Sequence, residues 1–212
     1  MFKFVAPAIL VLVTSVPALA QEPPLDTSAL TNNRYGKMEA LVEKTFLQVN
    51  VASAKIRFDD QTARNLERLA RGQEYSAERA ERIARTAVKA QNAYAVVRFE
   101  RDVPLDRFIK AVRQNLQRAK KAGMITEENY QHVSNQLPKW FGFLKQRGIK
   151  KGDRFLYRAR PQGLRTVMVD SHGKEMLDQT DAGADSRLAM LSGYFAPGSD
   201  FRKPLIESLF ED

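Results

Sequence analysis

The chain has 212 residues, with 34 Lys and Arg against 25 Asp and Glu, two His and no Cys, which gives a formal net charge of +9. Without Cys the protein has no disulfide, no thiolate nucleophile and no cysteine metal site. No carboxylates are spaced around His132 or His172 as zinc ligands would be. We therefore predict neither a metal nor a cofactor.

The positive charge does not indicate nucleic-acid binding. Basic residues are spread over amphipathic segments and alternate with Glu, as in residues 78–89, a pattern typical of solvated helix faces. The interleaving of aromatic and basic residues that single-strand binders use is missing from the sequence. We predict no nucleic-acid partner, and from the net charge only a weak contact with anionic membrane surfaces.

The first 20 residues have the features of a cleavable secretory signal. Lys3 gives a positive start, residues 4–16 are almost continuously apolar, and Ala18 and Ala20 occupy the two small-residue positions that a signal peptidase reads. The apolar run is shorter than the about 20 residues of a membrane span. We predict cleavage after Ala20, a periplasmic or secreted protein without a transmembrane segment, and a partly flexible lead over residues 21–43.

Residues 46–58 are predicted to form a long strand. Apolar residues at positions 47, 49 and 51 have one parity, whereas Ile56 and Phe58 have the other. Both sets can face the core only if the strand contains a bulge. We place this bulge near Ala52 and Ser53.

Helical patterns follow this strand. We predict a helix over residues 60–71 that ends at Gly72, and a second helix capped by Ser76. A strand over 94–101 then leads into an amphipathic helix that begins at Leu105. Thr126 caps a further helix, which Pro138 is expected to kink or split.

The C-terminal part is predicted to contain three short antiparallel strands between residues 151 and 179, separated by turns. Asp181 is expected to cap a helix, and a closing helix follows the break at Pro197–Ser199. Strands and helices occur in runs rather than in strict alternation. This order predicts an α+β fold, in which helices cover an antiparallel β-sheet.

Three stretches resemble the chalcone-isomerase fold, and in particular its bacterial exported relatives. They are the strand 46–58, the strand-turn-helix VRFERDVPLDRFIKAVRQNL at 97–116, and IKKGDRFLYRARPQGLRTVMVDSHGKEM at 149–176. The resemblance implies an open-faced sandwich over residues 44–212. The helical sequence at about 60–91 departs from compact relatives and is interpreted as an insertion.

The resemblance also implies a set of site residues. Plant chalcone isomerases surround their substrate with an Arg, two Thr, a Tyr and an Asn. In this sequence the early Thr corresponds to Asn50, the Tyr to Phe108 and the Asn to Asn115. The late Thr corresponds, with looser alignment, to Gly193. Lys44 is the candidate that would replace the missing cation. The family's Arg would fall at 38–41, where none stands, and Arg34 is too far upstream.

These differences predict against isomerase activity, because Phe108 has no hydroxyl and the cavity would lack a fixed cation for a developing enolate. The sequence instead favours a non-catalytic protein that binds a small apolar or amphipathic ligand such as a fatty acid. The missing Arg weakens the fatty-acid choice, because plant fatty-acid-binding relatives use a comparable Arg. Binding to an envelope protein or a membrane surface is the alternative. Phe108 is most simply explained as a core residue.

Overall fold

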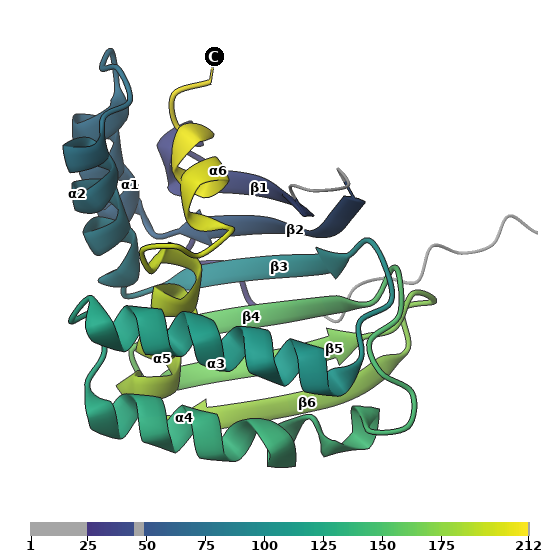
Figure 1. Cartoon of the computed structure of the whole chain (residues 1–212). Helices are drawn as coiled ribbons and strands as arrows, with labels where there is room; N and C mark the ends of the chain where they lie inside the picture. Colours follow the sequence, from purple (N-terminus) through teal and green to yellow (C-terminus); the bar gives the residue numbers. More distant parts are fainter. Residues whose placement is uncertain (1–24, 45–48, 212) are drawn as a thin grey trace, which may run out of the picture.

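A six-stranded antiparallel sheet forms the centre of the protein. The computed structural model describes residues 25–44 and 49–211. The strands follow one another across the sheet in chain order, so each pairs with its neighbours in sequence (Figure 1). They are β1 (Lys37–Lys44), β2 (Val49–Phe58), β3 (Ala93–Phe99), β4 (Arg154–Arg160), β5 (Gly163–Val169) and β6 (Glu175–Ala182). The three predicted C-terminal strands are β4, β5 and β6.

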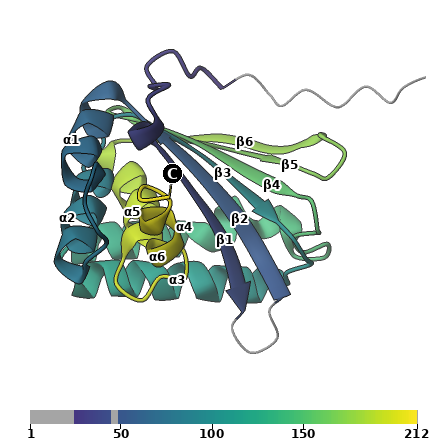
Figure 2. The ribbon, with the colours of Figure 1, turned by 90° about the horizontal axis from the view of Figure 1, so that it is seen from above.

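Helices cover one face of this sheet. Figures 1 and 2 show α3, α4 and α5 on that face, with α1 and α2 at one end of the sheet and α6 beside β1. The helices are α1 (Asp60–Ala70), α2 (Ala77–Val88), α3 (Leu105–Lys121), α4 (Glu127–Trp140), α5 (Ala184–Phe195) and α6 (Arg202–Glu207), with 3₁₀ turns η1 (Arg34–Gly36) and η2 (Gly142–Leu144). The predicted α+β class, an antiparallel sheet covered by helices, is confirmed.

The pairing of β1 with β2 contains the predicted bulge. Val42 lies opposite Ala52, whereas the next residue, Glu43, lies opposite Asn50, so Val51 has no partner across the pair. The bulge is one residue from the predicted position. Beyond it, Ala52, Ala54, Ile56 and Phe58 are buried. The extra residue therefore accounts for the change of parity along the sequence.

Side-chain caps begin several helices where the sequence indicated. Ser76 Oγ accepts from the Arg79 amide at the start of α2. Thr126 and Asn129 form a reciprocal capping box at the start of α4. These bonds satisfy amides that have no partner inside the helix.

Of the two outcomes predicted at Pro138, a kink or a split, the split was wrong, because helix α4 continues to Trp140. Pro138 cannot donate to the carbonyl of Ser134, and that carbonyl accepts from the Arg113 guanidinium instead, at 3.0 Å. Asp181 is a residue of β6 rather than the cap of α5, which begins after Gly183, where φ is 96°.

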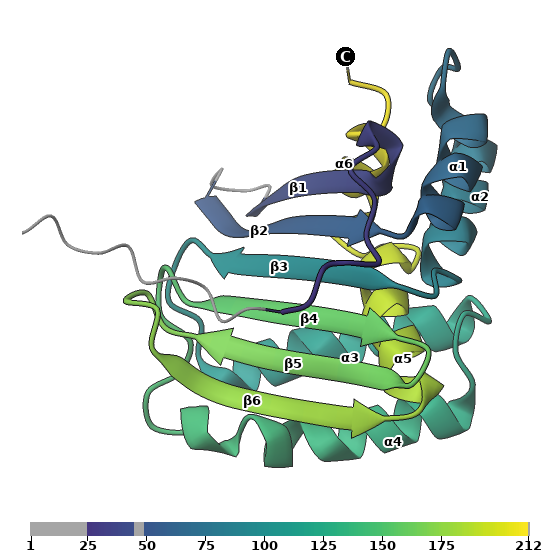
Figure 3. The same cartoon turned by 180° about the vertical axis from the view of Figure 1, so that it is seen from behind.

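Residues 25–43 of the segment predicted as a partly flexible lead belong to the fold. Strand β1 forms one edge of the sheet, so the sheet begins before residue 44. Residues 25–33 cross the sheet face that is turned toward the viewer in Figure 3, where Leu25 packs against Leu156, Val167 and Val169. The predicted signal, residues 1–20, and residues 21–24 lie outside the described part of the chain. No helix within that part is long and apolar enough to cross a membrane.

Candidate ligand cavity between sheet and helices

A cavity of about 420 Å³ lies between the inner face of the sheet and helices α3, α4 and α5. It follows α3 from Pro104 to Leu116, an axial length of about 18 Å at 1.5 Å per residue. Most of its lining is apolar, and its size is in the usual range for small-molecule sites. The mostly apolar lining suits a ligand with an apolar body.

Four phenylalanines form one wall of the cavity. The rings of Phe108 and Phe155 stack at 5.5 Å, and Phe141 meets Phe108 edge to face at 5.2 Å. Phe99 meets Phe155 edge to face at 5.7 Å. These packed aromatic side chains give the cavity a rigid apolar surface.

Two phenols that the sequence analysis missed also line the cavity. Tyr157 follows Phe155 by two residues on β4, so both side chains face inward. Tyr194 belongs to α5, and the two hydroxyls interact by hydrogen bonding. Burial raises the pKa of both phenols above the ordinary value. They are therefore protonated at neutral pH and act as hydrogen-bond donors or acceptors rather than as bases.

Two arginines reach the cavity as well. Arg101 follows β3, two residues beyond the buried Phe99, and its side chain lines the cavity, as does that of the exposed Arg107. Arg101 Nε is buried and has no hydrogen-bond partner among the described residues. The expectation that the cavity lacks a cation and a phenol was therefore wrong. The missing information was the strand register, which decides which basic and aromatic side chains face inward.

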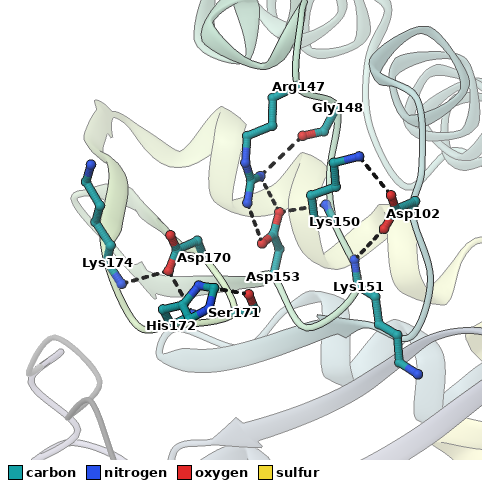
Figure 4. Close-up of polar contacts among 10 residues, drawn as sticks. All are labelled: Asp102, Arg147, Gly148, Lys150, Lys151, Asp153, Asp170, Ser171, His172 and Lys174. Carbon is teal, nitrogen blue, oxygen red and sulfur yellow. Dashed lines mark hydrogen bonds and ion pairs between the residues drawn. The ribbon is translucent and has the colours of Figure 1, made fainter.

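A network of polar contacts holds the end of β3 in place (Figure 4). Asp153, which is fully buried, accepts from both terminal nitrogens of Arg147, at 2.5 and 2.9 Å, and from the Lys150 amide at 2.7 Å. Asp102 accepts from Lys150 Nζ at 2.8 Å and from the Lys151 amide at 2.9 Å. These bonds explain the Lys-Lys-Gly-Asp motif, because they fix the loop that enters β4.

The same loop pairs with the chain after β3. Val103 and Ile149 exchange both backbone hydrogen bonds, at 2.8 and 2.9 Å. The Phe99 amide donates to the Asp153 carbonyl at 2.9 Å. The backbone on both sides of Arg101 is therefore tied to the loop.

One solved structure shows which fold this is. The crystal structure of a fatty-acid binding protein from Arabidopsis thaliana superposes with a TM-score of 0.54 at 11% sequence identity, covering 89% of this chain and 94% of that protein. The fold is chalcone-isomerase-like. No family model and no curated protein match the sequence. The fold expected from the sequence is confirmed, and membership of a bacterial exported family stays a prediction.

The chalcone-isomerase-like fold brings three of the predicted site residues together. Phe108, Asn115 and Gly193 all line the cavity, and the Asn115 side-chain oxygen accepts from Arg118 at 2.9 Å. Lys44 and Asn50 are placed in β1 and β2 by their backbones, and their side chains lie outside the described part. That any of the five contacts a ligand stays a prediction.

Arg34 does not reach the cavity. Its guanidinium donates to the backbone carbonyls of Leu209 and Glu211 near the C-terminus. Within residues 25–44 and 49–211, no three His, Asp or Glu side chains are grouped as metal ligands would be. The described polar groups of the cavity are arginine, phenol, indole, amide, hydroxyl and carboxylate groups.

Proposed function

We propose that this chalcone-isomerase-like protein binds a small apolar or amphipathic molecule, such as a fatty acid, in the cavity under α3 and does not convert it chemically. The observation that carries the proposal is the mostly apolar cavity of about 420 Å³ with its aromatic wall. A well-packed domain of this size leaves few voids larger than a water molecule. An apolar space of this volume is therefore better explained by a ligand than by imperfect packing.

The likeness to a fatty-acid binding protein supports the same proposal, because that protein has a similar fold over almost its whole length. Three titratable groups of the cavity also favour binding over catalysis. Tyr157 and Tyr194 are protonated at neutral pH, and the Asp102 carboxylate is engaged by Lys150. None of these three groups is poised to abstract a proton from a bound molecule.

We further propose that the protein acts after export. The support is the sequence of residues 1–20, with its positive start, short apolar run and small residues before Gln21. A periplasmic or secreted binding protein would meet its ligand at the cell envelope or outside it. N-terminal sequencing of protein recovered from the expressing cell checks the cleavage site.

Filling the cavity tests the binding proposal. A Cβ added at Gly193 meets nothing within 4 Å, and Gly193 is helical and lines the cavity. Gly193→Leu should therefore abolish binding of a fluorescent fatty acid. It should also keep or raise the free energy of unfolding, by up to about 1 kcal/mol, because Leu has the higher helix propensity.

Gly193→Ala is the matched control, because it gains most of the helix propensity and leaves most of the cavity open. It should bind the fluorescent fatty acid like the unchanged protein. Binding that is unaffected in Gly193→Leu, with a normally folded protein, would show that the cavity is not the site.

A further inference from the structure

Arg101 lines the cavity, and its buried Nε has no hydrogen-bond partner among the described residues. Three arginines, Arg57, Arg101 and Arg187, have a buried Nε without a partner among the described residues. Two of them donate from another guanidinium nitrogen to a backbone carbonyl. Arg57 donates to the carbonyl of Thr31, and Arg187 donates to the carbonyl of Ala90. Arg101 has no such bond within the described part of the chain. Its charge lies against the cavity without a protein partner there.

The nearest carboxylates in sequence are already engaged. Glu100 accepts from Ser53 Oγ at 3.3 Å and lies 3.8 Å from Arg98. Asp102 is held by Lys150 and by the Lys151 amide. A partly buried guanidinium that no carboxylate of the described residues pairs with is unfavourable, because desolvation of the charge is not compensated there. An anion that enters the cavity supplies the missing compensation.

The backbone at Arg101 is also held in place before any ligand arrives. The Phe99–Asp153 bond precedes it and the Val103–Ile149 pair follows it. The loop that makes these bonds is itself held by the Arg147–Asp153 ion pair, which Figure 4 shows. The backbone that carries Arg101 therefore needs no rearrangement when the side chain meets an anion, which favours affinity.

Next to Arg101 the lining becomes aromatic. Phe99 precedes it by two residues on the same side of β3, and Phe99 contacts both Phe108, at 6.1 Å, and Phe155, at 5.7 Å. The Tyr157 ring stacks at 6.0 Å on Phe155, two residues further along β4. The cavity thus has a cation at one end of a run of rings.

We propose that the ligand is a single-chain carboxylate, whose head group pairs with Arg101 and whose apolar chain lies along Phe99, Phe108 and Phe155. This rests on the proposed binding function and adds the charge and the orientation of the ligand. Carboxylate is the preferred head group because a planar guanidinium binds it through two parallel hydrogen bonds.

Binding of cis-parinaric acid and of its methyl ester, measured by fluorescence with the purified protein, tests the assignment. The acid should bind more tightly than the ester. Arg101→Gln should weaken binding of the acid about 10- to 100-fold, as expected for a charge-assisted bond, and leave the ester unchanged. Arg101→Lys keeps the charge but not the fork of donors, and should give an intermediate affinity for the acid.

Arg98→Gln is the matched control. It removes the same charge from β3, three residues away, where the side chain is 58% exposed. It should bind both probes like the unchanged protein, and thermal unfolding should show that all variants are folded. Equal loss of acid binding in Arg98→Gln and Arg101→Gln would show that the effect comes from the net charge of the protein. This result would overturn the assignment of Arg101 as the partner of the head group.

Other outcomes separate this assignment from the binding proposal. If acid and ester bind equally well and Arg101→Gln changes neither, the head-group assignment fails while the binding function stands. If neither probe binds to the unchanged protein, the binding function itself fails for this class of ligand. Dodecyl phosphate that displaces the probe far better than dodecanoate would identify a phosphate head group and overturn the choice of carboxylate.

Discussion

The two faces of the sheet each have an arginine, and the two differ in how many of their donors have partners. On the outer face, Arg158 is 3% exposed and donates to the carbonyls of Asp26, Ala93 and Ala159, at 2.7, 3.2 and 2.7 Å. On the inner face, Arg101 lines the cavity with its Nε unpartnered in the described residues. Burial lowers the pKa of Arg158, but each of its three guanidinium nitrogens donates at least one hydrogen bond.

This difference separates a structural arginine from one available to a ligand. The outer face is closed by the chain itself, because residues 25–33 cross it and supply Leu25 and the Asp26 carbonyl. The inner face is covered by helices that leave a cavity. Burial alone therefore does not separate a structural arginine from a ligand-binding one. The number of guanidinium donors that have partners is the better guide to function.

The largest effect is expected from removing the structural arginine. Arg158→Met should lower the free energy of unfolding by about 3 kcal/mol, because it leaves buried carbonyls without their donors. Urea denaturation measures the change. Affinity for the fluorescent fatty acid should stay the same in the folded protein.

Arg160→Met is the control for this prediction. Arg160 pairs with the Asp26 carboxylate, but the two side chains are 42% and 56% exposed, so the pair contributes little. A change in unfolding free energy as large as that of Arg158→Met would show that charge, and not the buried hydrogen bonds, accounts for the effect.

A smaller loss of stability, coupled to a loss of binding, is expected at Asp153. Asp153→Asn removes the buried charge that accepts from Arg147 and Lys150, and should lower the unfolding free energy by about 2 kcal/mol. Since this loop holds the backbone beside Arg101, the preference for the acid over its methyl ester should shrink. Urea denaturation and the two probe titrations measure both effects.

Asp170→Asn serves as the comparison for that change. Asp170 accepts from the amides of His172 and Lys174 in the neighbouring turn, also shown in Figure 4. Removing its charge should leave the preference for the acid intact. A loss of preference in both variants would mean that the Asp153 loop does not specifically position Arg101.

The fold could be predicted from the sequence wherever one local pattern decided the structure. Ser76 and Thr126 are followed by amphipathic helices, and the parity change between residues 51 and 56 required a bulge. Strand β1 was missed, although Met38, Ala40 and Val42 alternate with charged or exposed residues. The polar, proline-bearing residues before it favoured a flexible segment, and its pairing with β2 is a tertiary contact.

The site was harder to predict for the same reason. Phe108, Asn115 and Gly193 could be named because the resemblance supplied their positions. Arg101 is one of several basic residues near the end of β3, and composition does not show which of them faces inward. Tyr157 was treated only as part of a strand. Its neighbour Tyr194 belongs to a helix, so only the tertiary structure brings the two phenols together.

The smallest expected effect is a pH dependence that tests which cation holds Asp102. The hydrogen bond from Lys150, followed by that from the Lys151 amide, lowers the pKa of Asp102 below its ordinary value of 3.8. A carboxylate whose folded-state pKa is depressed stabilises the protein above the unfolded-state pKa, and this contribution is lost as the pH falls through the folded-state pKa. Asp102→Asn should therefore be slightly less stable than the unchanged protein at pH 7, and the difference should close below about pH 3.8.

Urea midpoints between pH 7 and pH 3 measure this difference, with Glu74→Gln in the α1–α2 loop as a control for loss of an exposed carboxylate. Combining Asp102→Asn with a second change identifies the partner of Asp102, because a double-mutant cycle isolates the pair. Lys150→Met should remove most of the pH-dependent difference, whereas Arg101→Gln should leave it unchanged. The reverse result would make Asp102 the counter-ion of Arg101, and the cavity would then have no cation left for a carboxylate ligand.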